Sequence, residues 1–103
     1  METTARPEMK LIKQEGNLKL YKITAKAGMQ MPAHHSTNEV AIIVQEGAAT
    51  ITFEEDSIEL KTSEPIIIPA GKTHSLFIHS NFAAIAVMAN TAEIKFEKNL
   101  SSL

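Results

Sequence analysis

The sequence contains no cysteine and no tryptophan, and it has only four glycines and four prolines among 103 residues. The absence of cysteine excludes disulfide scaffolds, thiolate metal sites and cysteine nucleophiles. Segment 1–15 is charged and has no apolar core, so it predicts neither a signal peptide nor a membrane span. We therefore expect a cytoplasmic protein that does not bind a membrane.

The sequence also lacks an excess of one charge. Ten Lys and Arg residues against twelve Asp and Glu residues give a formal net charge of −2. No cluster of Lys or Arg provides the positive surface that nucleic acids or anionic membranes require, so neither is an expected partner. The length predicts one small domain with a modest core, which favours support from a partner subunit.

Ile, Val and Thr are abundant and occur in short runs between turn residues, not at helical spacing, which predicts an all-β fold. We expect a polar lead over 1–8, a β domain over 9–90, and a tail over 91–103 that forms a short helix or a frayed strand. Gly, Asn, Asp and Pro between the runs predict hairpins and antiparallel sheets. The expected strands are 9–13, 18–27, 29–34, 40–46, 48–54, 58–60, 65–69, 74–79 and 82–88.

Three of these runs, 40–44, 65–69 and 82–88, are apolar at nearly every position. A strand with one face in water should instead alternate apolar and polar residues. The pattern therefore predicts that something covers the outer side of these strands. Pairing with a second copy of the chain is the simplest explanation, and a homodimer is expected.

The four histidines are His34, His35, His74 and His79. If the two strand edges that bear the first three face one barrel mouth, neutral imidazoles from both edges can converge on a divalent metal. Zn, Ni and Fe suit imidazole ligands, and Mn suits an additional carboxylate. His79 lies in a turn beside Ser and Asn, where a solvated side chain is expected.

Two segments carry a family resemblance. Gly28 and His34 are separated by five residues, an apolar strand leads to Gly47, and the segment Pro69-Ala70-Gly71-Lys72-Thr73-His74 lies further along. They resemble the two sequence motifs of the cupin superfamily, and the resemblance extends over 28–88. It implies a single-domain double-stranded β-helix, a jelly-roll barrel of two antiparallel sheets with a ligand pocket between them.

The resemblance also implies a metal site made of three His and one Glu, and here the sequence departs from the motif. Counting from His34 places Ser36 at the second His position and Val40 at the Glu position. Counting from Glu39 instead places His35 at the second His position. Because side chains alternate along a strand, only one of the two registers faces the pocket, unless a bulge near 36–38 combines them.

The candidate metal ligands are therefore His34, His74, His35 and Glu39, for Zn, Ni, Mn or Fe. Two other interpretations stay open: a metal-free pocket in which the histidines hydrogen-bond an organic ligand, and histidines that only stabilise strand ends. Cupins include dioxygenases, isomerases, decarboxylases and non-catalytic binding or sensing domains, so the fold does not decide whether the chain is an enzyme. We expect a protein that binds a small molecule in the barrel pocket.

Overall fold

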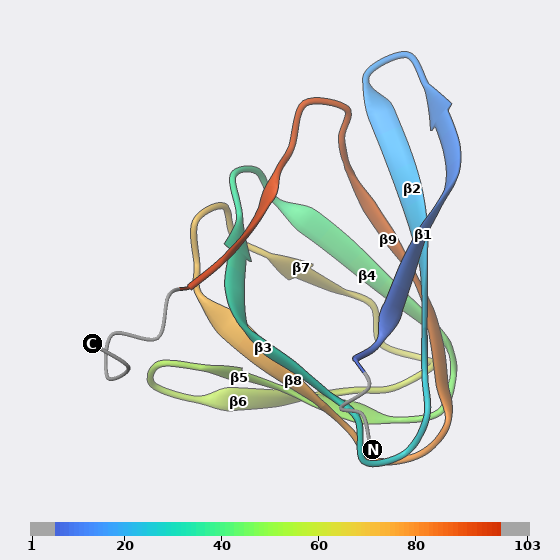
Figure 1. Cartoon of the computed structure of the whole chain (residues 1–103), viewed down its shortest axis with the longest axis vertical. Coiled ribbons are helices and arrows are strands. Elements are labelled where there is room, and N and C mark those ends of the chain that lie inside the picture. Colours follow the sequence, from blue (N-terminus) through green and yellow to red (C-terminus); the bar gives the residue numbers. More distant parts are fainter. Residues whose placement is uncertain (1–5, 98–103) are drawn as a thin grey trace, which may run out of the picture.

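The computed structural model describes residues 6–97, which fold into two five-stranded sheets that face each other (Figure 1). Every pair of neighbouring strands is antiparallel. The strands are β1 (Glu8–Glu15), β2 (Leu18–Ala25), β3 (Gln30–Ser36), β4 (Val40–Glu46), β5 (Ala49–Phe53), β6 (Ser57–Leu60), β7 (Ile66–Ile68), β8 (His74–Ile78), β9 (Phe82–Ala89) and β10 (Ile94–Phe96). The predicted all-β jelly-roll architecture is confirmed.

The first sheet has the strand order β1-β2-β9-β4-β7, and the second has the order β10-β3-β8-β5-β6. From β2 onward, each connection carries the chain to the other sheet (Figure 1). The one exception is the hairpin between β5 and β6, which stays within the second sheet. This winding encloses one interior between the sheets. None of the residues from 6 to 97 belongs to a helix that is long and apolar enough to cross a membrane.

Strict alternation of burial builds the core. On β9, Phe82, Ala84, Ala86 and Met88 are buried and the residues between them are half-buried. β4 and β5 show the same period of two, with Val, Ile, Ala and Phe side chains pointing inward. Burying such side chains from both sheets is the main stabilising contribution of the fold.

The C-terminal segment, for which the sequence predicted a short helix or a frayed strand, contains the strand β10. It pairs with β3, with Ile94 opposite Ser36 and Phe96 opposite His34, and so extends the second sheet by one edge strand. At the other end of the chain, β1 begins at Glu8, within the expected polar lead. The rest of the lead and of the tail, 1–5 and 98–103, lies outside the described residues.

An irregularity in β3 controls which of its side chains point inward. The register with β8 shifts between Met31 and His34, so Met31, His34 and Ser36 are all buried although a regular strand would alternate them differently. An extra residue in one strand of an antiparallel pair has this effect. The sequence suggested a bulge near 36–38, whereas the shift in register lies before His34.

Candidate functional site

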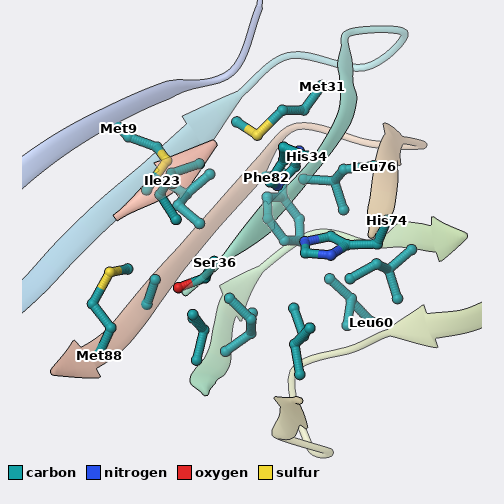
Figure 2. A pocket seen from close by; sticks show the side chains of 16 residues that line it. Met9, Ile23, Met31, His34, Ser36, Leu60, His74, Leu76, Phe82 and Met88 are labelled. Carbon is teal, nitrogen blue, oxygen red and sulfur yellow. The ribbon is translucent and has the colours of Figure 1, made fainter. Parts of the chain in front are cut away.

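A cavity lies between the two sheets and has a volume of about 50 Å³. Most of its wall is apolar, and the side chains include three methionines, Met9, Met31 and Met88 (Figure 2). Within the described part of the chain, three lining residues carry a polar side-chain group: His34, Ser36 and His74. All three are buried, at 6%, 3% and 7% exposure, respectively.

His34 and His74, here called the histidine pair, are direct cross-strand partners on β3 and β8. Their ring centroids are 4.3 Å apart and the rings meet edge to face at an interplanar angle of 63°. Directly opposed residues on one face of a sheet have Cβ atoms close enough for such contact. The two sequence motifs, far apart along the chain, therefore meet at one point of the cavity wall.

Each ring of the histidine pair is held by its own strand. His34 Nδ1 lies 2.7 Å from the Pro32 carbonyl oxygen, and His74 Nδ1 lies 2.8 Å from the Lys72 carbonyl oxygen. A carbonyl only accepts hydrogen bonds, so in both rings Nδ1 carries the proton and donates it. The remaining nitrogen, Nε2, carries a lone pair and is the atom that each ring offers to a ligand.

Burial keeps the histidine pair neutral. Loss of solvation in the interior lowers the pKa of His34, and the nearby His35 and Arg6 lower it further, while the hydrogen bond to Pro32 opposes the shift. Burial likewise lowers the pKa of His74, against the effect of its hydrogen bond to Lys72. Both groups are therefore uncharged hydrogen-bond acceptors at neutral pH.

The structure also shows which register of the first motif faces the cavity. His34, Ser36 and Val40 line it, so the positions that hold the second His and the Glu in the cupin motif carry a serine and a valine here. His35 points away from the interior and Glu39 is exposed in the connection between β3 and β4. Of the four candidate ligands, the fold brings together His34 and His74 and separates the other two from them.

The remaining histidines lie on the outer surface. His35 Nδ1 is 2.8 Å from Glu97 Oε2, and Thr73 donates a hydrogen bond to the same oxygen. The hydrogen bond from His35 is the main reason why the pKa of Glu97 is lowered. His79 is exposed, as expected, and its Nε2 contacts the Thr50 hydroxyl at 2.6 Å.

The donor set does not complete a site for a divalent metal. Among residues 6–97, no three His, Cys, Asp or Glu side chains are grouped so that they could hold a metal ion. Protein sites for Zn and Fe usually supply three or four ligands, often with a carboxylate that offsets the charge. The cavity offers two neutral imidazoles and one hydroxyl, surrounded by apolar side chains.

Aromatic rings flank the histidine pair on both sides, and the sequence analysis did not single them out. The Phe96 ring lies 5.2 Å from that of His34, and the Phe53 ring lies 5.9 Å from that of His74. The Arg6 guanidinium lies 4.7 Å from the Phe96 centroid, and Lys72 Nζ lies 4.3 Å from the Phe53 centroid. These contacts depend on strand pairing, which no local motif reveals.

The fold, together with a pocket between its sheets, defines a small cupin domain. The chain belongs to the family described as mannose-6-phosphate isomerase C-terminal, whose profile matches residues 4–101. A search of curated proteins gives no match.

Solved structures share the fold of this chain. An uncharacterized conserved protein with a double-stranded β-helix domain from Klebsiella pneumoniae superposes with a TM-score of 0.79 at 17% identity, covering 95% of this chain and 85% of that one. A cupin superfamily protein from Desulfitobacterium hafniense gives 0.74 at 16% identity, covering 86% and 82%. An RmlC-like cupin from Desulfovibrio desulfuricans gives 0.69 at 24% identity, covering 82% of both chains. At these identities the likeness concerns the fold alone.

Proposed function

We propose that this cupin domain binds a small organic molecule in the cavity, anchored on the histidine pair without a metal. The observation that carries the proposal is the pair of fixed Nε2 acceptors in the wall of an otherwise apolar cavity. Ligand pockets typically combine an apolar lining with a few placed polar groups that orient the ligand. The histidine pair has this role, and the methionine, isoleucine and leucine side chains form the apolar lining.

The fixed tautomer supports a binding role over a purely structural one. A histidine that only stabilises a strand end is satisfied by its backbone hydrogen bond through Nδ1. Here two such rings are direct cross-strand neighbours, and the backbone uses only Nδ1 of each. The Nε2 atoms of both rings therefore stay available to accept a hydrogen bond from a ligand.

The description of the family names an isomerase of a phosphorylated sugar. Phosphate recognition relies on Arg, Lys or backbone N–H groups at a helix N-terminus. Among the described residues, no Arg or Lys lines this cavity, and its wall has few polar groups for sugar hydroxyls. We therefore do not extend that activity to this chain.

A metal-bound form is the second candidate, and one observation favours it. Histidines that bind metals commonly donate the other ring nitrogen to a backbone carbonyl, as both members of the histidine pair do. Zn, Ni, Mn or Fe at this position would require ligands beyond those that residues 6–97 supply, such as water or a carboxylate of the bound molecule.

The test uses protein purified without chelator and without nickel affinity resin. Elemental mass spectrometry gives the metal content, and the thermal midpoint is then followed against a library of small metabolites. The proposal predicts a metal content far below one ion per chain and a midpoint that rises with particular compounds by mass action. Stoichiometric metal, or a midpoint that only metals raise, would contradict it in favour of the second candidate.

The matched variants are His34→Asn and His74→Asn. The Asn side-chain amide places an N–H near the position of Nδ1, so the bond to the strand carbonyl can be kept while Nε2 is removed. We expect both variants to fold and to lose the ligand-induced rise in midpoint. His79→Asn, on the outer surface, is the control and should keep it.

A further inference from the structure

The polar groups of the cavity define what a bound molecule must offer. His34 and His74 present acceptors through Nε2. The Ser36 hydroxyl oxygen accepts a hydrogen bond from the Asn38 N–H at 3.2 Å, so its own O–H is left to donate. A ligand hydroxyl meets one demand of each kind, because its proton is donated to one of the two Nε2 atoms and its oxygen accepts from Ser36. A carbonyl or ether oxygen only accepts, so it donates to neither Nε2 atom.

The charges around the cavity disfavour an ionic ligand. None of the described residues that line it is a Lys, Arg, Asp or Glu. The cationic groups of Arg6 and Lys72 lie over the rings of Phe96 and Phe53, and neither residue belongs to the lining. A carboxylate or ammonium group in the cavity would lose its hydration without an opposite charge to replace it, which is strongly unfavourable.

The volume limits the size of the molecule. A cavity of roughly 150 Å³ holds a benzene molecule, and this cavity has about 50 Å³. It therefore accepts only a few non-hydrogen atoms before its wall has to move. Met9, Met31 and Met88 are the side chains best suited to move, because an unbranched thioether adapts its shape at low cost.

We infer that the cavity selects a small uncharged alcohol, whose hydroxyl lies between the histidine pair and Ser36 and whose short apolar chain packs against the methionines. This inference rests on the proposed function and specifies the ligand class of the same site. It assigns to Ser36, at a motif position where cupins otherwise carry a metal-binding His, the role of a hydrogen-bond donor to the ligand.

The experiment compares three probes of nearly equal shape: n-propanol, propionate and propylammonium. At about pH 8 the two ions are fully charged and the histidine pair is neutral. Each probe is titrated into the whole protein with ¹⁵N-labelled histidine, and the Nε2 resonances of His34 and His74 are followed. We expect n-propanol to shift both resonances along a saturating curve, and each ion to need at least about tenfold more ligand, equivalent to about 1.4 kcal/mol.

Two variants separate binding in the cavity from a solvent effect. His34→Asn together with His74→Asn should abolish the saturable response of the Met31 and Met88 methyl signals to n-propanol. Ser36→Ala should weaken n-propanol binding while leaving both imidazole resonances in place. A response of the methyl signals that is unchanged in the Asn double variant would overturn the inference.

The outcomes also distinguish this inference from the proposed function. If an ion saturates the Nε2 shifts at a lower concentration than n-propanol, the ligand class is wrong but the binding site stands. If none of the three probes shifts either Nε2 resonance, the alcohol inference fails. The metabolite library then decides separately whether the cavity binds any organic molecule.

Discussion

His34 and His74 are direct cross-strand partners, and each donates its Nδ1–H to the carbonyl oxygen two residues before it, in Pro32 and Lys72. The same hydrogen bond thus appears on both strands, and it leaves Nε2 unprotonated in two rings that line one cavity. The bulge between Met31 and His34 is what brings the first ring into line with the second.

The free energy of unfolding should decrease in acid, over a pH range set by the pKa values of the histidine pair. The pKa of each buried imidazole is below the ordinary value of 6.5, so below about pH 6.5 the unfolded chain binds protons that the folded chain does not. The free energy of unfolding should therefore be constant above pH 7 and decrease from about pH 6.5 downward, by at most about 1.4 kcal/mol per pH unit for each imidazole.

Urea denaturation at a series of pH values measures this slope. In the double variant of His34→Asn and His74→Asn, the free energy of unfolding should change less between about pH 6.5 and pH 5 than in the wild type. Glu97 affects stability over a different pH range. The hydrogen bond from His35 lowers the pKa of Glu97, so this carboxylate stabilises the fold above pH 4.5, its ordinary pKa, and the stabilisation is lost at lower pH. A wild-type slope equal to that of the double variant would show that the pair is not buried as described.

Restoring the two missing motif residues should create a metal site. Ser36 and Val40 face the cavity beside the histidine pair, so Ser36→His with Val40→Glu completes a set of three His and one Glu. We expect this variant to retain close to one Zn or Mn ion per chain in elemental mass spectrometry, whereas the wild type retains far less.

The matched control is Ala33→His. It creates the motif spacing with His35 and Glu39 in the alternative register, on the side of β3 that points away from the cavity. This variant should gain no tightly held metal. Equal metal content in both variants would mean that the register assigned to β3 is wrong.

Replacing Gly47 by alanine should be far more damaging than replacing Gly71. Both glycines have a positive φ, of 84° and 76°, so alanine at either position costs about 1–2 kcal/mol of backbone strain. At Gly47 a Cβ atom would also clash with the Asn81 carbonyl oxygen, whereas at Gly71 nothing lies within 4 Å. We expect Gly47→Ala to cost at least about 2 kcal/mol more in urea denaturation. Similar losses for the two variants would contradict the close approach of Asn81.

The predicted homodimer is best tested on the outer face of the first sheet. Across β9, β4 and β7, Val87, Ala41 and Ile67 are neighbours, and Ile85 is paired with Ile43 one row away. Ile67 is 69% exposed and Ile43 is 42% exposed. A contiguous apolar face of this kind is typical of a contact with another protein surface, and we propose a second copy of the chain.

Ile67→Glu should weaken self-association at least about tenfold, as measured by sedimentation across a dilution series. Phe77→Glu is the control, because Phe77 is 40% exposed but lies on the second sheet. A wild-type chain that is monomeric at all concentrations, or an equal effect of Phe77→Glu, would exclude this face as the dimer contact.

The sequence predicted the fold because its signals are local. Short apolar runs between turn residues mark the strands, and the segment from Pro69 to His74 marks the second motif. What the sequence could not show depends on pairing across the sheets. It left two registers open around His34, because one bulged residue reverses which side chains face inward, and the bulge lies between Met31 and His34, before the segment 36–38 where the sequence suggested one. It also gave no sign that Phe96 packs beside His34.

The most direct test of the central claim is the protonation state of the two rings. Long-range ¹H–¹⁵N correlation spectra of histidine-labelled protein distinguish a nitrogen that carries a proton from one with a lone pair. At about pH 7.5 the account predicts, for both His34 and His74, a protonated Nδ1 and an unprotonated Nε2. A proton on Nε2, or a charged ring at that pH, would contradict the account, because the cavity would then lack the acceptors on which the proposed ligand depends.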